Sequence, residues 1–189
     1  MNTQLFQGTL VRLAPIEPEH DAEIESQWTH DAEYMRAMYA EPMRPLSPNQ
    51  IKKKYEDAEK ESSHNSFQFA LRALADDRLI GTVGLSRIEW TNGISGLTLG
   101  IGAADDRGKG YGGEALRLVL AYAFGELNLY RVAVNTFEYN HRAIRFFERA
   151  GFQIEVRRRE AIHRDGKRWD AVMLGLLRDE WIAQVKRQP

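Results

Sequence analysis

The segment between residues 95 and 136 constrains the fold most. Its pattern predicts a strand, a glycine-rich turn, an amphipathic helix and a second strand, in that order. The turn holds four glycines in the six residues 108–113. Apolar residues then recur at helical spacing, which predicts a helix that packs against a sheet: Leu116, Val119, Leu120, Ala123 and Leu127. A β-α-β segment places its two strands parallel, so at least part of the sheet is expected to be parallel.

The glycine-rich turn predicts an anion-binding site. A helix that begins near Gly110 leaves several backbone amides unpaired at the positive end of its dipole, and this arrangement holds phosphates. Glycine is favoured wherever a side chain would keep the backbone away from a ligand. A tight turn without a ligand is the alternative, but four glycines in six residues carry an entropic cost that such a turn does not require.

The remaining patterns predict further strands and helices. Strands are expected near residues 9–14, 67–71, 79–85 and 130–136, and helices near 15–28, 47–61 and 140–150. Residues 152–162 and 168–177 flank an Asp-Gly turn, which predicts a hairpin. The predicted fold class is α/β (α+β mixed), with a single twisted mixed sheet of about seven strands flanked by helices. We expect one domain over residues 1–189.

Composition excludes several functional classes. The chain has 26 basic and 27 acidic residues and no long basic block, so nucleic acid is not an expected partner. It has no cysteine, which excludes disulfides and thiolate chemistry, and its five histidines lack ligand spacing, so no metal site is expected. No run of 18 apolar residues and no leader-like segment occurs, which predicts a cytoplasmic protein without a membrane partner.

Two other phosphate-binding motifs can be compared with the turn. Residues 108–113 satisfy G-x-G-x-x-G and Glu138 follows the next strand, as in a dinucleotide-binding fold. However, five residues separate the strand from Gly108, and the preceding strands are predicted to be antiparallel. A Walker loop is excluded because Lys109 is followed by glycine instead of Ser or Thr. The third interpretation is an R-x-x-G-x-G motif over residues 107–112.

Residues 97–113, together with the segment NHRAIRFFERAGF at 140–152, resemble the GNAT superfamily of acyl-CoA-dependent N-acetyltransferases. The closing hairpin at 165–174 is similar to the branch that includes ribosomal-protein N-terminal and spermidine acetyltransferases. The similarity extends over residues 9–181 and is weakest between 20 and 66. Two such segments with a strand between them are far more specific than the glycine pattern alone.

The resemblance implies acetyl-CoA, or coenzyme A, as the co-substrate. The strand before the turn would pair with the pantetheine arm through Leu99, Gly100 and Ile101. Asn140 would reach the same arm, although a simple helix cap is the alternative for this residue. The pyrophosphate would lie on backbone amides of the turn: Arg107, Gly108, Lys109, Gly110, Tyr111, Gly112 and Gly113.

Acetyl transfer to an amine requires a base or a water relay and an oxyanion donor. Glu89, just past a predicted strand, is the first candidate for the base, and Glu160 in the closing hairpin is the second; each can also be a solvated carboxylate. Many relatives carry a tyrosine acid where this chain has Phe147, which is also expected to contact the cofactor. A thiol with a pKa of about 8.5 leaves as a thiolate without an acid, and Tyr139 is a substitute candidate.

Charged segments leave the acceptor open. The five acids between residues 17 and 25 either attract a cationic amine or form a solvated helix face, and Arg157, Arg158 and Arg159 can contact an anionic substrate or a nucleotide phosphate. The predicted reaction is direct acetyl transfer in a ternary complex to a primary amine: a protein N-terminus, a polyamine or another small amine. An acyl-CoA-binding or sensing module without turnover is the alternative. A homodimer is a further expectation.

Overall fold

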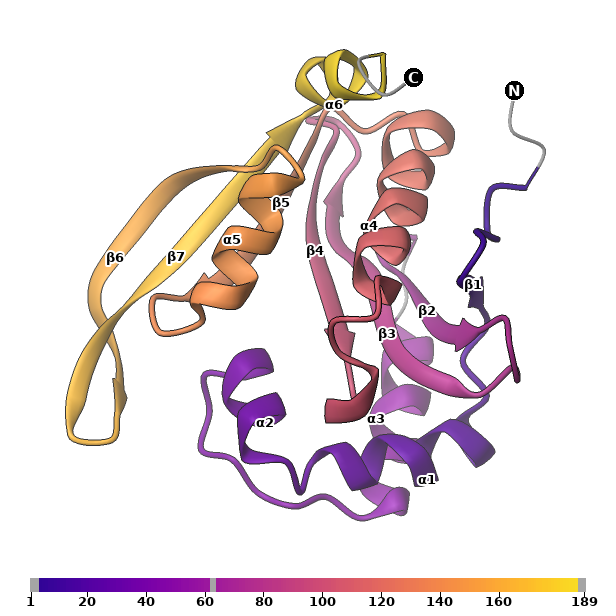
Figure 1. Ribbon diagram of the computed structural model, residues 1–189, viewed down its shortest axis with the longest axis vertical. Coiled ribbons are helices and arrows are strands. Elements are labelled where there is room, and N and C mark those ends of the chain that lie inside the picture. The colour runs from indigo at the N-terminus through magenta and orange to yellow at the C-terminus, as the bar shows by residue number, and fades with distance from the viewer. Residues whose placement is uncertain (1–3, 62–63, 187–189) are drawn as a thin grey trace.

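The computed structural model describes residues 4–61 and 64–186. Within that part of the chain, seven strands form one sheet in the order β1-β2-β3-β4-β5-β7-β6 (Figure 1). The pair β4·β5 is parallel, and the other neighbouring strands are antiparallel. The strands span Val11–Ala14 (β1), Phe67–Ala73 (β2), Leu79–Glu89 (β3), Ile94–Ile101 (β4), Arg131–Phe137 (β5), Gln153–Arg164 (β6) and Lys167–Leu177 (β7). The predicted mixed seven-stranded sheet is confirmed, and a dinucleotide fold with its parallel sheet is excluded.

The helices flank this sheet. They span Pro18–Trp28 (α1), Ala32–Met38 (α2), Pro48–Glu61 (α3), Tyr111–Ala121 (α4), His141–Arg149 (α5) and Arg178–Val185 (α6). Helix α4 continues as a π-helical turn, Tyr122–Glu126. The predictions missed α2 and α6, because helices of seven and eight residues show too few turns for a clear periodic pattern. In α2, the side chain of Asp31 caps the helix by accepting hydrogen bonds from the amides of Glu33 and Tyr34.

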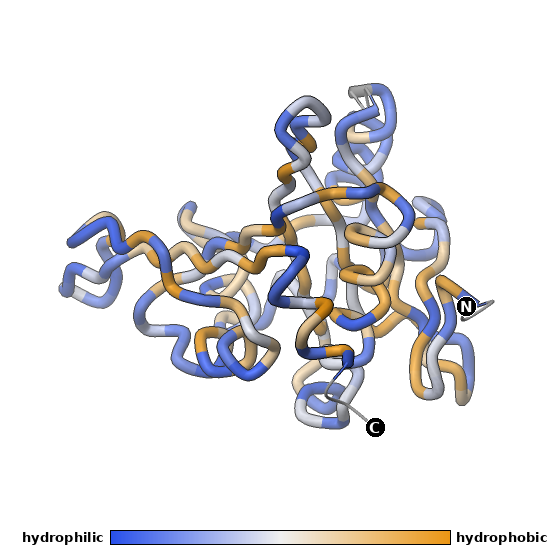
Figure 2. The backbone as a smooth tube through the Cα atoms, turned by 90° about the horizontal axis from the view of Figure 1, so that it is seen from above, coloured by the Kyte–Doolittle hydropathy of each residue, from blue (hydrophilic) through white to orange (hydrophobic). Residues whose placement is uncertain are grey.

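Two apolar clusters lie on opposite faces of the sheet. Side chains that alternate along β2 divide between them, with Leu71 in the larger cluster and Ala70 in the smaller one. Helices α4 and α5 supply Val119 and Phe147 to the larger cluster, while α1 supplies Trp28 to the smaller one. Apolar residues accordingly concentrate in the centre of the molecule, and hydrophilic ones mark the protruding end on the left (Figure 2).

The acids of α1 do not form a solvated face throughout. Asp21 and Glu25 are buried, at 1% and 3% exposure. Asp21 accepts a hydrogen bond from Arg72 at 2.8 Å, and Glu25 accepts one from Lys54 at 3.0 Å. The alternative that they attract a cationic substrate also loses support, because both carboxylates are already neutralised by partners of the same chain.

Strands β4 and β5 diverge along their length. They pair only between Ile94–Leu97 and Arg131–Val134, although both strands continue for several residues. Beyond this pairing β5, β7 and β6 lean away from β4, with α5 over one half of the sheet and α4 over the other (Figure 1). The divergence leaves backbone groups of both strands without a neighbouring strand.

Candidate active site

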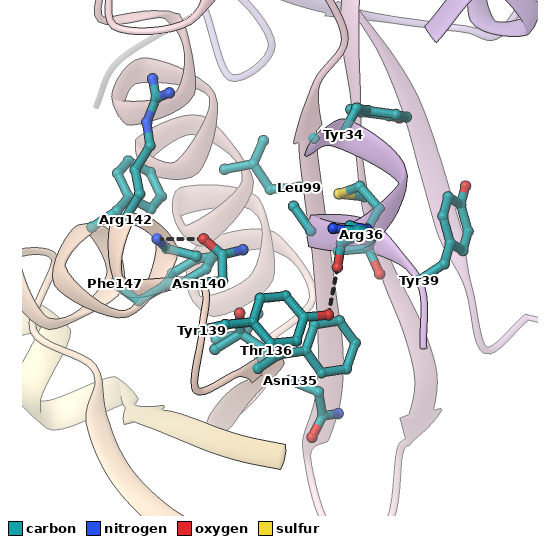
Figure 3. Close-up of a pocket in the computed structure, with 18 of the residues that line it drawn as sticks. Tyr34, Arg36, Tyr39, Leu99, Asn135, Thr136, Tyr139, Asn140, Arg142 and Phe147 are labelled. Atoms are coloured by element: carbon teal, nitrogen blue, oxygen red, sulfur yellow. Dashed lines mark hydrogen bonds between the residues drawn. The ribbon is translucent and has the colours of Figure 1, made fainter. Parts of the chain in front are cut away.

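A cleft of about 1280 Å³ opens where β4 and β5 diverge. Its walls come from segments far apart in the sequence: α2, the end of β4, the glycine-rich turn, β5, the start of α5 and the β6–β7 hairpin. In Figure 3, Asn140, Arg142 and Phe147 lie on one side and Tyr34, Arg36 and Tyr39 of the α2 region on the other, with Leu99 between them. The cleft therefore brings both predicted motifs to one place.

The backbone of β4 offers two residues to the cleft. The amide of Gly102 donates to Ile80 of β3 at 2.9 Å, and hydrogen-bonded pairs alternate along antiparallel strands. Gly100 and Thr98 therefore face β3, whereas Leu99 and Ile101 face the opening. By the same alternation, Asn135 and Phe137 face it from β5, since the amide of Arg131 donates toward β4, to Gly93. The expected contribution of Gly100 through its amide is thus wrong, because that amide pairs with β3.

The glycine-rich turn has the geometry of an anion cradle. Gly108 and Gly110 have φ of +83° and +91°, a region that favours glycine, and Gly110 is the N-cap of α4. The first amides of α4 have no partner within the helix. A Cβ built on Gly113 meets no atom within 4 Å, so the protein itself gives no reason for glycine at that position. Gly112 and Gly113 both line the cleft, which fits a ligand lying against this turn.

The charged side chains of the turn are engaged by the protein. Arg107 donates to Asp31 and to the carbonyl of Gly102, both at 2.6 Å. The Asp31 carboxyl loses solvation, but its hydrogen bond with Arg107 and the amides it caps lower its pKa overall. Lys109 lies 3.6 Å from Asp106. The side chains of Arg107 and Lys109 thus shape the turn, and what the turn offers a phosphate is its amides.

Near α5 the cleft is lined by two residues with polar side chains, Asn140 and Thr136, and by the apolar Phe147. The Oδ1 of Asn140 accepts a hydrogen bond from the Ala143 amide at 3.1 Å, so the helix-cap interpretation is correct for this atom. Its Nδ2 has no hydrogen bond assigned to it within the described residues. Thr136 of β5 is 3% exposed, and its hydroxyl is the buried side-chain polar atom without a partner in the described part of the chain. Phe147 is buried in the core beside Phe152 and provides an apolar wall.

Tyr139 and Arg142 also line the cleft. The Tyr139 hydroxyl donates to the carbonyl of Arg36 at 2.8 Å (Figure 3), which connects the segment after β5 to α2. Burial raises the pKa of Tyr139, partly offset by nearby arginines. Arg142 places its Nη2 3.9 Å from the position that a Cβ would occupy on Gly108. Sequence reasoning missed this guanidinium, although its place in the first turn of α5, facing the glycine turn, supplies a cation beside the cradle.

The two predicted base candidates lie elsewhere. Glu89 is exposed, pairs with Ile94 at the far end of β4 and accepts a hydrogen bond from Asn92 at 2.9 Å. Glu160 is an exposed bulge residue with φ of +53°. Neither is among the residues that line the cleft, so neither carboxylate is placed to act as a base there. No cluster of three potential metal ligands occurs within residues 4–61 and 64–186.

The chain is similar to known acetyltransferases. A model described as "Acetyltransferase (GNAT) domain" matches residues 11–153. The "Probable N-acetyltransferase YjcK" of Bacillus subtilis (strain 168) is 36% identical over 68% of this chain and 71% of its own. The spermidine N(1)-acetyltransferase of Escherichia coli (strain K12) is 24% identical over 93% of this chain and 90% of its own. A crystal structure of spermidine N-acetyltransferase from Vibrio cholerae, in complex with CoA and spermine, aligns with a TM-score of 0.79 at 20% identity, covering 91% of this chain and 98% of that one.

Proposed function

Because this chain belongs to the GNAT acetyltransferase family, we propose that the cleft between β4 and β5 binds acetyl-CoA and presents its thioester to an amine. The chain is an N-acetyltransferase, and the reaction moves an acetyl group from acetyl-CoA to an amine. The observation that supports the site is that the backbone groups of Leu99 and Ile101 that face the cleft pair with no strand. These two residues lie next to a glycine turn with open space in front of it.

Each wall of the cleft has a distinct role in this proposal. The amides of residues 108–113 bind the pyrophosphate, and Arg142 adds a positive charge beside them. Leu99 and Ile101 pair with the pantetheine arm as a missing strand would, which fixes the thioester along β4. Asn140 Nδ2 and the Thr136 hydroxyl donate to polar atoms of the same arm. The turn amides, Leu99, Ile101 and Asn140 were predicted from the sequence, whereas Arg142 and Thr136 were not.

Acetyl-CoA supplies a thioester whose carbonyl carbon the amine attacks, so that a C–N bond forms, the C–S bond breaks and the thiol is released. A backbone amide of β4 aimed at the carbonyl oxygen stabilises the charge that develops there. With phenylalanine at 147, the protein supplies no tyrosine hydroxyl at that position. We propose that the thiolate leaves without a protein acid, and that water carries the amine proton away through the open side of the cleft.

The catalytic unit extends past the matched residues 11–153. Ile162, Trp169 and Ala171 of the β6–β7 hairpin line the cleft, and β7 pairs with β5 in the same sheet. We therefore propose that residues 1–189 act as a single N-acetyltransferase domain. A cytoplasmic location is part of this proposal and agrees with the absence of cysteine from the sequence. Among the described residues, no helix is long and apolar enough to cross a bilayer.

The matched variants Gly113→Asp and Gly113→Asn test the cradle. The two side chains have nearly the same size, and each points into space that no protein atom occupies. The aspartate places a negative charge among the amides that bind phosphate, so its affinity for coenzyme A is expected to be roughly 10- to 100-fold lower than that of the asparagine variant. Thermal stabilisation by coenzyme A measures the affinity. Equal affinities of the two variants would contradict the assignment of the phosphates to this turn.

Thiol release from acetyl-CoA in the presence of an amine panel separates the enzyme from the sensing alternative. We expect thiol release to require an amine. The Gly113 variants should rank in their rates of release as they rank in their affinities for coenzyme A. Stabilisation by coenzyme A without any amine-dependent release would favour a module that binds the acyl carrier and does not turn over. Stabilisation by NAD but not by coenzyme A would contradict both.

A further inference from the structure

The cleft carries more positive than negative charge, although the whole chain has a net charge of −1. Its lining includes seven arginines and four carboxylates. Three of these carboxylates are already paired: Asp106 with Arg78 at 2.6 Å, Asp165 with Arg36 at 3.0 Å, and Glu33 with Arg107 at 3.6 Å. The acids therefore leave little negative charge for a cationic acceptor.

Two of the arginines, Arg87 of β3 and Arg158 of β6, form no ion pair and no hydrogen bond through their guanidinium groups within the described residues. Both line the main cleft, and both also line an adjoining cavity of about 350 Å³. Asn135 of β5 lines the same two cavities. Two arginines from opposite halves of the sheet thus line one shared space, and Asn135 lines it from β5, which lies between β3 and β6 in the strand order.

The local structure directs these side chains. Arg87 has φ of +52° in the irregular end of β3, and its Nη2 lies 3.5 Å from the position of a Cβ built on Gly96. The guanidinium of Arg87 therefore lies over Gly96 of β4. On the other side, Arg158 lies opposite Ala171 of β7, next to a register shift in β6. Each arginine therefore has a small residue as its neighbour on the adjacent strand, Gly96 for Arg87 and Ala171 for Arg158.

The phosphates of the cofactor do not account for this pair. The glycine turn follows the end of β4 at Ile101, whereas Arg87 lies over Gly96. Five residues of extended strand separate these two positions by about 16 Å. A pyrophosphate held on the amides of the turn therefore leaves Arg87 for a different anion.

We propose that the acceptor is an amine that carries a carboxylate, and that Arg87 and Arg158 bind this carboxylate with Asn135 between them. The inference rests on the proposed function, since it names the acceptor of that same site. Guanidinium groups bind carboxylates in a planar, two-point geometry, which fixes orientation as well as charge. The bound carboxylate would hold the amine toward the point where β4 and β5 part.

The same charges act on the reactivity of the acceptor. Nearby cations disfavour the ammonium form of an amine, so a larger fraction of the bound acceptor is in the neutral, nucleophilic form. This effect reduces the need for a carboxylate base, which the cleft does not offer at Glu89 or Glu160. A polyamine, in contrast, would bring several positive charges against unpaired arginines.

The test compares amino acids with their own amides, which replace the carboxylate with a neutral carboxamide, and rates are compared per neutral amine because the amide has the lower amine pKa. Wild-type kcat/KM is expected to be at least about 10-fold higher for the acid than for the amide, and spermidine is expected to be poorer than either. Peptide amides with an acidic second residue form a separate arm, which distinguishes a free amino acid from an acidic protein end as the source of the carboxylate. Equal turnover of acids and amides, or spermidine as the best acceptor, overturns the proposal.

Variants locate the effect. Arg158→Gln and Arg87→Gln are each expected to raise KM for carboxylate acceptors roughly 10- to 100-fold while leaving KM for acetyl-CoA and turnover of the amides within about twofold. Arg158→Lys keeps the charge but loses the two-point geometry, so its KM for carboxylate acceptors is expected to lie between those of the wild type and Arg158→Gln. Arg159→Gln, an exposed neighbour that lines neither cavity, is the matched control. A loss in Arg159→Gln equal to that in Arg158→Gln overturns the proposal.

A binding measurement separates this inference from the proposed function. Calorimetry compares the binding of an N-acetyl amino acid with that of its amide to protein saturated with coenzyme A. We expect the acid to bind more tightly than the amide, and this preference should be lost in Arg158→Gln. Discrimination in binding without turnover of any amine supports the carboxylate site and contradicts the function. Turnover without discrimination between acid and amide leaves the function standing and overturns the carboxylate site.

Discussion

At the scale of single residues, Thr136 connects stability to function. A buried hydroxyl without a partner costs free energy in the folded protein, and Thr136 is such a residue on the wall of the cleft. Phe147, which lines the same cleft, carries no such free-energy cost, because its apolar ring packs against Phe146 and Phe152. A bound ligand that accepted a hydrogen bond from the Thr136 hydroxyl would therefore remove a free-energy cost that is present in the ligand-free protein.

Replacing Thr136 with valine should separate the two effects. We expect Thr136→Val to raise the free energy of unfolding by about 1 kcal/mol, because it removes an unpaired buried hydroxyl at nearly constant volume. The same variant should bind acetyl-CoA several-fold more weakly. Urea unfolding and steady-state kinetics measure the two quantities. Ser95→Ala is the control, since the Ser95 hydroxyl is hydrogen-bonded and its loss should destabilise; a less stable Thr136→Val would show that the hydroxyl has a partner.

At the scale of elements, β4 serves two neighbours with alternate residues. All four residues from Thr98 to Ile101 pair in register with β3 and lie past the last pair with β5, but the amides of Thr98 and Gly100 face β3 while those of Leu99 and Ile101 face the opening. The function of this strand therefore depends on where its pairing stops, and a pairing that continued to Ile101 would fill the space for the ligand with β5.

Amide exchange measured residue by residue should show this alternation. Without ligand, the amides of Leu99 and Ile101 are expected to exchange much faster than those of Thr98 and Gly100, because only the latter are hydrogen-bonded to β3. Acetyl-CoA should slow the exchange of the first pair and leave the second pair unchanged. Equal protection of all four amides in the free protein would mean that the strands close on each other in solution.

At the scale of the whole molecule, Glu114 joins the N-terminal segment to helix α4. Its carboxylate accepts hydrogen bonds from the amides of Thr9, Leu10 and Val11 at 2.6–2.8 Å, and from the Thr9 hydroxyl. Burial of the carboxylate raises its pKa, but these hydrogen bonds lower it more, to about 2. The first turn of α4 is thereby held to the edge of the sheet, from which the glycine turn takes its position.

Glu114→Gln should weaken this connection in a pH-dependent way. A carboxylate whose pKa is lowered by folding stabilises the protein fully above its ordinary pKa of 4.5, and this contribution is lost as the pH falls toward the folded-state pKa of about 2. At pH 7 the variant is expected to lose about 2 kcal/mol in the free energy of unfolding. The difference from wild type should shrink below pH 4.5. Glu126→Gln, at an exposed position, is the control, and a difference that stays constant down to pH 2.5 would contradict the hydrogen-bonded carboxylate.

Local patterns were sufficient for the glycine turn, the cap and the hairpin. Gly151 adopts the left-handed conformation that its place at the C-terminal end of α5 predicts, Asn140 caps α5, and Asp165 with Gly166 forms the two-residue turn. Each of these depends on the conformational preference of a residue and its immediate neighbours. The mixed sheet followed from the order of these elements, and the resemblance to the GNAT superfamily followed from two segments in sequence.

The amino-acid sequence by itself determined most of the elements, the glycine-rich turn and the family, because these depend on short-range backbone preferences and on motifs contiguous in the chain. Only the tertiary structure decided where β4 and β5 part, which carboxylates are buried and which arginines share the cleft. Glu89 and Glu160 lie outside the cleft, whereas Arg87 and Arg158, from strands more than 60 residues apart, line it together. Which distant residues lie together depends on the register of the sheet and on strands far apart in the chain. The periodicity of a single segment carries no information about either.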